Sequence, residues 1–257
     1  MRTLTADRES ALSLSELEQK RDHLADLQSV DFRAANIIAW VAARIPPGGR
    51  VLDVGCGAGG LVAYLLEQGI DARGIDTSEA TIGAARQHLE SRGQDPSRIS
   101  IGLTTELIEA GNLMDTVVCM DCLEHVEDDQ SLFDELVALC RPGDTLIVTV
   151  PAMMRLYGER DVAIGHYRRY ETDTLKALVR GAPLQIRELR FWNLLGVAPT
   201  YFSQKLLGRN IDEEFRFGKP SLSRRVLRRG LHTWFRYVEN RIPGPFGMTL
   251  LLHATRQ

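Results

Sequence analysis

Two aspartates and a cluster of glycines lie where apolar, strand-like runs end in the first third of the chain. Asp53 precedes Gly55 by two positions, and Gly55 opens the pattern G-x-G-x-x-G over residues 55–60. Asp76 ends the next apolar run, 21 positions after Gly55. Glycines between a strand and a helix let a ligand approach the backbone closely, at a helix N-terminus. The pattern therefore predicts a ligand site built from a loop and two carboxylates.

The two aspartates narrow the class of ligand. A carboxylate at Asp53 would repel a pyrophosphate but suits a cationic group. Asp76 can accept hydrogen bonds from both hydroxyls of a ribose. A cation combined with a ribose describes S-adenosyl-L-methionine, which becomes S-adenosyl-L-homocysteine when it donates its methyl group. Two alternatives stay open: a dinucleotide such as NAD, which the glycine pattern also fits, and a purely structural turn.

Short apolar runs alternate with helical patterns over most of the chain and must position these residues. Strand-like runs occupy residues 50–54, 72–75, 99–103, 116–120, 145–150, 184–192 and 248–254. Helical patterns occupy residues 31–44, 57–68, 78–89, 129–139 and 172–180, and residues 194–241 indicate two or more further helices. This alternation is typical of an α/β fold, in which a parallel sheet lies between helices.

Four segments resemble class I S-adenosylmethionine-dependent methyltransferases, of the ubiquinone-type or small-molecule group. They are VLDVGCGAGG at 51–60, GIDTSEA at 74–80, DTVVCMDCLEHV at 115–126 and LCRPGDTLIV at 139–148. The resemblance implies a Rossmann-like, doubly wound sheet of seven mostly parallel strands with an antiparallel last strand, plus a helical cap. It divides the chain into N-terminal helices (1–45), a cofactor-binding domain (46–193 and 243–257) and a helical cap (194–242).

The same resemblance implies cofactor contacts, residue by residue. Gly55 and Gly57 would border the methionine part, with Asp53 near its ammonium and Asp76 on the ribose. Thr77 and Thr104 are expected to contact the adenine, and Met120 and Asp121 the methyl-bearing end. Arg33 is expected to contact the cofactor carboxylate. Thr104 stands in a segment where many relatives have an acid that holds the adenine amino group. For Arg33, a solvated surface charge is the alternative.

Asp121, Glu124 and His125 stand together after the fourth strand, where the acceptor of the methyl group is expected. Glu124 and His125 are candidate catalytic residues, and a helix cap with solvated charges is the alternative. The order D-x-x-E-H, with a later His such as His166, also resembles a metal-binding pattern of small-RNA 2′-O-methyltransferases. Oxygen and imidazole ligands could hold Mg²⁺ or Zn²⁺. The prediction is a site without metal, because most relatives with a Glu-His pair need none.

The segment of residues 157–170 resembles the H-D-x-x-x-G-H-x-R-R-Y stretch of a bacterial methyltransferase subfamily, with Arg160 in place of the first His. His166 is the expected base or orienting group, since histidine exchanges a proton near neutral pH. Tyr157, Tyr167, Arg168 and Arg169 are the expected acceptor-binding residues. The alternative is a structural loop whose arginines pair with helix carboxylates.

Composition and charge limit the partners of the protein. The 257 residues carry a net charge of −3, which argues against a dedicated nucleic-acid binder. Residues 186–245 hold 12 Lys and Arg against 5 Asp and Glu, so a basic segment of +7 accompanies a remainder of −10. This segment could cover the cleft, pack on the sheet or contact an anionic membrane surface. Its bulky apolar groups could also line a tunnel for a hydrophobic acceptor.

The sequence also predicts the cellular compartment and the role of the cysteines. No secretory signal and no apolar run of about 18 residues is found, which predicts a cytoplasmic protein. Cys119 and Cys122 form a single C-x-x-C pair without a second pair to complete a zinc site, so Cys119 is expected to be a core thiol.

These observations predict an enzyme that transfers a methyl group from S-adenosyl-L-methionine to a small, hydrophobic or aromatic acceptor. Oxygen is the first choice for the accepting atom, with carbon and nitrogen open. An NAD-type oxidoreductase and a catalytically inactive cofactor-binding regulator are the alternatives, and the oligomeric state is left open.

Overall fold

The computed structural model describes residues 32–205 and 222–257. One sheet of seven strands runs through it, in the order β3-β2-β1-β4-β5-β7-β6. The strands are β1 (Val51–Val54), β2 (Ala72–Asp76), β3 (Ile99–Ile101), β4 (Met114–Met120), β5 (Cys140–Pro151), β6 (Leu184–Trp192) and β7 (Thr249–Arg256). Only β7 runs antiparallel to its neighbours in this sheet, β5 and β6. The doubly wound, mostly parallel sheet with an antiparallel last strand is confirmed.

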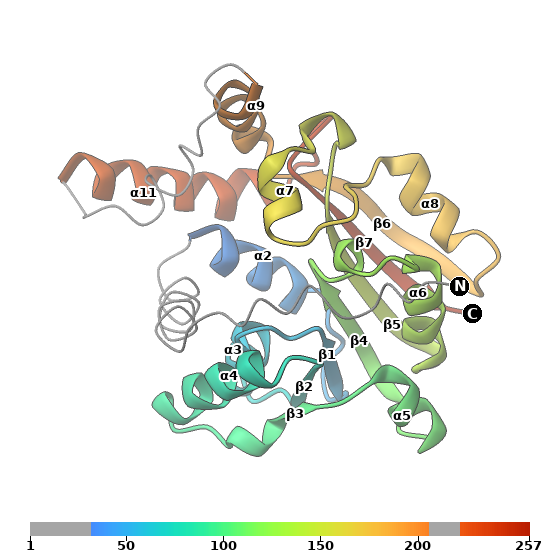
Figure 1. Ribbon diagram of the computed structural model, residues 1–257. Helices are drawn as coiled ribbons and strands as arrows, with labels where there is room; N and C mark the ends of the chain where they lie inside the picture. Colours follow the sequence, from blue (N-terminus) through green and yellow to red (C-terminus); the bar gives the residue numbers. More distant parts are fainter. Residues whose placement is uncertain (1–31, 206–221) are drawn as a thin grey trace, which may run out of the picture.

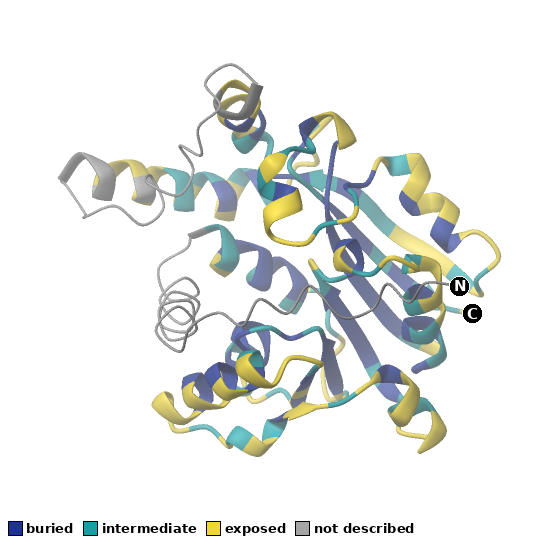
Figure 2. Ribbon diagram, viewed as in Figure 1, coloured by how far each residue is buried: buried dark blue, intermediate teal, exposed yellow. Residues whose placement is uncertain are grey.

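Helices cover both faces of the sheet. On one face lie α2 (Phe32–Ala42), α3 (Gly60–Glu67) and α4 (Glu79–Ser91), and on the other lie α5 (Thr104–Glu109), α6 (Asp129–Ala138) and α8 (Thr172–Val179). Figure 1 shows α2, α3 and α4 to the left of the sheet and α6 and α8 to its right. Alternate residues of one strand therefore enter different cores: Val51 packs with the first set and Leu52 with the second. The central strands are buried, and the exposed residues lie mainly on the helices and connecting loops around them (Figure 2).

Two helix starts show how local residues set the element bounds. The helix expected from Gly57 begins only at Gly60, because Gly59 has a left-handed φ of +74° and forms its N-cap. Helix α4 begins one residue later than expected, since Ser78 is its N-cap and accepts a hydrogen bond from the backbone N–H of Thr81. Strand β5 extends further back than the expected 145–150, to Cys140, which pairs with Met114 of β4.

The segment expected as a helical cap contains α9 (Val197–Lys205), α11 (Leu222–Trp234) and a π-helical turn, η5 (Phe235–Glu239). Residues 206–221 lie outside the described residues, as do residues 1–31 of the expected N-terminal helices. The end of this segment packs on the sheet face that carries α2, where Phe235 is buried. By contrast, Val226 and Leu227 of α11 are 66% and 49% exposed. Among the described residues, no helix is both long and apolar enough to cross a bilayer.

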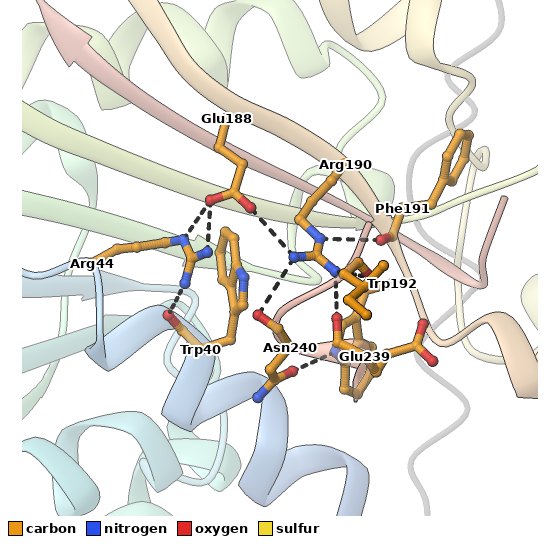
Figure 3. A network of polar contacts seen from close by, with 9 residues as sticks. Trp40, Arg44, Glu188, Arg190, Phe191, Trp192, Glu239 and Asn240 are labelled. Carbon is orange, nitrogen blue, oxygen red and sulfur yellow. Dashed lines mark hydrogen bonds and ion pairs between the residues drawn. The ribbon is translucent and has the colours of Figure 1, made fainter. Parts of the chain in front are cut away.

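Buried polar contacts attach this segment to the sheet edge (Figure 3). The guanidinium of Arg190 on β6 donates to the carbonyl oxygens of Glu239 and Ile242, the latter at 3.0 Å. The indole N–H of Trp192 donates to Oδ1 of Asn240 at 2.8 Å. Asn240 in turn donates from Nδ2 to the carbonyl oxygen of Asn36 on α2 at 3.0 Å. The turn after η5 is thus held between β6 and α2.

Candidate active site

A cavity of about 1260 Å³ opens at the carboxyl ends of β1, β2 and β4. In a doubly wound sheet, ligands bind at this edge, where the strand order reverses on either side of β1. The expected site residues that line it are Arg33, Asp53, Gly55, Gly57, Asp76, Thr77, Thr104, Met120, Asp121, Glu124, His125, His166 and Arg169. The fold therefore gathers residues from six separate segments around one space.

The glycine loop is packed against the end of β4. Gly55 has a φ of +70°, and a Cβ atom there would lie 2.6 Å from Sγ of Cys122. Neither the backbone conformation nor the space therefore admits a side chain. The backbone N–H of Gly57 donates to Oδ2 of Asp76 at 3.1 Å, which couples the loop to the end of β2. The backbone N–H of Ser78 donates to Oδ1 of Asp76 at 2.9 Å and fixes the carboxylate from the other side.

Asp53 is a buried carboxyl group at the wall of the cavity. Its side chain is 3% exposed, and Oδ1 has no hydrogen-bond partner among the described residues. Burial, and then the nearby charge of Asp76, raises the pKa of Asp53 to about 8. An unpartnered acid in this position suits a cationic ligand group, so the residues present fit the ammonium of S-adenosyl-L-methionine.

Three residues that follow strands have left-handed backbones without being glycine. They are Asp121 (φ +49°) after β4, Met153 (+67°) after β5 and Asn193 (+63°) after β6. Such conformations cost about 1–3 kcal/mol each and gather at functional sites. Asp121 and Asn193 line the cavity. The surrounding protein raises the pKa of Asp121 by burial, against the opposing hydrogen bond from Thr149.

Glu124, His125 and His166 form a cluster that lines the same cavity as the glycine loop. Their potential ligand atoms all lie within 4.8 Å of one another, so the cluster has the composition and size to hold a metal ion. The imidazole rings of His125 and His166 meet edge to face, with centroids 4.6 Å apart. Burial, followed by the neighbouring imidazole of His166, lowers the pKa of His125.

Glu124 is the one acid of this three-residue cluster. It is 0% exposed, and neither carboxyl oxygen has a hydrogen-bond partner in the part of the chain that the structure describes. Burial, followed by the charge of Asp121, raises its pKa well above the ordinary value. Its Oε1 lies 3.7 Å from Nε2 of His166, which is longer than a hydrogen bond. The carboxyl group therefore lies beside His166 without a hydrogen bond to it, and it can form one with a bound molecule.

The loop of residues 154–170 brings His166 to the cavity. The loop follows β5 and returns beside the end of that strand, where Ala152 forms an isolated β-bridge with Tyr170. It contains the short helix α7 (Glu159–Ala163). The Nδ1 atom of His166 meets Oδ1 of Asp161 at 3.1 Å, a contact that the sequence did not reveal.

Three expected acceptor-binding residues lie outside the lining of the cavity. The hydroxyl of Tyr157 donates to the carbonyl oxygen of His166 at 2.7 Å, within the loop. Arg168 pairs with Asp129 at the start of α6 at 2.7 Å, as in the alternative of a structural loop. Tyr167 is 52% exposed. Arg169 does line the cavity, but its Nε donates to Oδ1 of Asp161 at 2.8 Å.

Thr104 lines the cavity, and its hydroxyl already has a partner within the protein. Its hydroxyl donates to the Glu135 carboxylate of α6, which also lines the cavity. Cys119 is fully buried, as expected for a core thiol. Asn193 and Met248 complete the lining from β6 and the approach to β7, and neither carries a sequence signal for this role.

Comparison with known proteins decides the family. A family model described as a methyltransferase domain matches residues 29–189, more than half of the chain. The protein belongs to this methyltransferase family. The methyltransferase is 34% identical over 164 residues to the ubiquinone biosynthesis O-methyltransferase of Xanthomonas campestris pv. campestris (strain B100). That match covers 58% of this chain and 69% of the relative.

A second relative, from Acinetobacter baylyi, carries the same name and is 37% identical over 97 residues. This match covers 37% of the methyltransferase and 41% of the relative. Both relatives are named as O-methyltransferases, and the family uses S-adenosyl-L-methionine. The resemblance seen in the sequence and the identification as an S-adenosylmethionine-dependent enzyme are therefore confirmed.

Solved structures agree on the fold. A SAM-dependent methyltransferase from Thermotoga maritima has a TM-score of 0.55 and 16% identity, and the match covers 93% of this chain and 96% of that one. A chain of the complex that contains the Haloferax volcanii Trm112 methyltransferase activator has a TM-score of 0.58 and 18% identity, covering 94% and 96%. At these identities the likeness shows the fold alone.

Proposed function

We propose that this methyltransferase transfers the methyl group of S-adenosyl-L-methionine to a hydroxyl oxygen of a small molecule of hydrophobic or aromatic character. The observation that carries the proposal is that His166 and Glu124 line the same cavity as the glycine loop. A proton-accepting imidazole is needed when the acceptor must lose a proton, as a hydroxyl does. The names of the curated relatives, which are O-methyltransferases, support oxygen as the accepting atom.

Two halves of the cavity serve the two substrates. Asp53, Gly55, Gly57 and Asp76 would hold the cofactor by its ammonium and its ribose, and Met120 and Asp121 would border its methyl group. Methyl transfer is an in-line displacement on an already activated carbon, so these residues contribute mainly alignment. Arg33, from α2, would meet the cofactor carboxylate.

The rim of the cavity supports a hydrophobic acceptor. Leu103 and Ile164 both line the cavity, and each is 50% exposed. When an apolar molecule covers large apolar side chains of a pocket, their removal from water contributes favourably to the free energy of binding. A free polar metabolite would leave them in water.

The test is a panel of phenols and aliphatic alcohols, with S-adenosyl-L-homocysteine formation as the readout. His166→Ala should lower kcat by about 100-fold or more, the usual effect of losing a general base, while cofactor affinity stays nearly constant. Tyr167→Ala, at an exposed position outside the cavity, is the control and should retain activity. Equal losses of kcat and cofactor affinity in His166→Ala would assign a structural role to His166 instead.

A further inference from the structure

Asp161 is a buried acid that lies directly against the proposed base. Its side chain is 1% exposed. Oδ1 lies 3.1 Å from Nδ1 of His166 and accepts a hydrogen bond from Nε of Arg169 at 2.8 Å. The backbone N–H of His166 also donates to the carbonyl oxygen of Asp161 at 2.8 Å. Asp161 therefore holds His166 at two points, one on the main chain and one on the side chain.

Further contacts fix Asp161 itself. Its Oδ2 accepts from the backbone N–H of Gly158 at 3.0 Å, at the start of α7. The guanidinium of Arg169 is 7% exposed, and its Nη1 donates to the carbonyl oxygen of Ala152 at 3.3 Å. Ala152 directly follows β5, so Arg169 connects the carboxylate to the sheet. A group held in this way keeps its partner in one orientation.

These contacts determine which nitrogen of His166 carries the hydrogen. Both carboxyl oxygens of Asp161 already accept hydrogen bonds from fixed donors, Oδ1 from Nε of Arg169 and Oδ2 from the backbone N–H of Gly158. A carboxyl group held in this way by N–H donors and by the guanidinium acts as an acceptor. Nδ1 of His166 must then be the donor, and in the neutral ring Nε2 keeps a free lone pair.

We propose that Asp161 is a positioning residue that fixes His166 with Nδ1–H toward Asp161 and the Nε2 lone pair toward the cavity, where it accepts the proton of a hydroxyl-bearing methyl acceptor. The inference rests on the proposed methyl transfer and defines its acceptor class. The acceptor oxygen bonds to the methyl carbon while the carbon–sulfur bond breaks, and the sulfonium becomes a thioether. The hydroxyl proton passes to Nε2, and the charge of Asp161 stabilises the resulting imidazolium.

Glu124 completes the place for that hydroxyl. Oε1 of Glu124 and Nε2 of His166 are 3.7 Å apart. A single oxygen atom can lie about 2.8 Å from both and form a hydrogen bond with each. The buried carboxyl group of Glu124 would orient the acceptor, and His166 would accept its proton.

The tautomer of His166 tests the proposal without any acceptor. Long-range ¹H–¹⁵N NMR of the EDTA-treated full chain, labelled at histidine and kept at pH 7.5, distinguishes protonated from unprotonated ring nitrogens. His166→Gln assigns the signals, because it removes those of His166. We expect the unprotonated nitrogen to be Nε2. An unprotonated Nδ1, or a ring with both nitrogens protonated, overturns the proposal.

A variant adds a second measurement. In Asp161→Asn the amide N–H can donate to Nδ1, so the unprotonated signal should shift wholly or partly from Nε2 to Nδ1. Asp95→Asn removes a hydrogen-bonded carboxylate far from this loop in sequence, at the N-cap of η1 (Pro96–Arg98), and should leave the spectrum of His166 unchanged.

The outcomes separate the two claims. An Asp161→Asn protein that folds and keeps the wild-type tautomer overturns the proposal, and if this variant does not fold, the wild-type spectrum alone decides. Calorimetry with S-adenosyl-L-homocysteine tests the proposed function independently. Absence of binding would refute methyl transfer while leaving the result on the tautomer in place.

Discussion

Asp53 should make cofactor affinity depend on pH. Its buried carboxyl group has a pKa raised by burial, and then by Asp76, from 3.8 to about 8. The free protein therefore holds Asp53 mostly protonated at pH 7, whereas the ammonium of a bound cofactor favours the carboxylate. Binding should release a proton from Asp53.

The magnitude follows from the fraction of Asp53 that is ionised. With a pKa of about 8, this fraction rises about ninefold between pH 6 and pH 7, equivalent to about 1.3 kcal/mol of binding free energy. S-Adenosyl-L-homocysteine has the same ammonium and does not react, so calorimetry with it measures the effect directly. Affinity should level off near pH 8, where the amino group of the ligand begins to lose its own proton.

Asp53→Asn should remove this pH dependence and weaken binding at pH 8 by about tenfold or more, since a charge-assisted contact is lost. Asp134→Asn, which removes an exposed acid on α6, is the control and should behave as the wild type. Equal affinity at pH 6 and pH 7 in the wild type, or a pH dependence that persists in Asp53→Asn, would refute the reasoning.

The same shift in pKa acts on the stability of the free protein. Folding raises the pKa of Asp53, so between about pH 4 and pH 8 the folded state keeps a proton that the unfolded chain has lost. Asp53 therefore destabilises the free protein increasingly as the pH rises through this range. Asp53→Asn should consequently melt at a higher temperature than the wild type at pH 8, even though it binds the cofactor less well.

Three further predictions concern the loop, the docked segment and the metal question. Gly55→Ala should abolish S-adenosyl-L-homocysteine binding, because its Cβ would meet Cys122, whereas Gly69→Ala (φ +73°, nothing within 4 Å) carries similar backbone strain and should still bind. Glu239→Ala should lower the free energy of unfolding by about 2–4 kcal/mol, since its carboxylate accepts from the backbone N–H of Leu194 and the indole N–H of Trp234, both at 2.9 Å. Urea denaturation measures this loss, which should be smaller in Glu239→Gln than in Glu239→Ala. EDTA should leave turnover unchanged; a loss that Mg²⁺ or Zn²⁺ restores would assign the cluster of Glu124, His125 and His166 to a metal ion.

The cofactor half of the site was predictable from the sequence because its geometry is local. Asp53 and Asp76 each end a strand, and the carboxyl ends of neighbouring parallel strands necessarily lie side by side. The glycine loop follows β1 directly, so its place needs no information from distant residues. The exception is the start of α3, which the left-handed backbone of Gly59 delays.

The acceptor half and the docked segment depend on contacts between distant residues. Glu124 and His166 meet because the loop after β5 folds back over the end of β4, which no periodicity in the sequence reveals. The pairing of Asp161 with His166 does have a local signal, since the histidine follows the acid by five positions, just after the short helix that contains the acid. Asn240 contacts Asn36 across 204 positions, so the attachment of η5 to α2 could not be inferred from either segment.

The structure of the methyltransferase with bound S-adenosyl-L-homocysteine tests the account most directly. We expect the ribose hydroxyls on Asp76, the ammonium beside Asp53, and the sulfur atom directed across the cavity toward Glu124 and His166. A homocysteine sulfur that faces away from this pair, or a ligand that does not contact Asp53 and Asp76, would contradict the assignment of the two halves of the site.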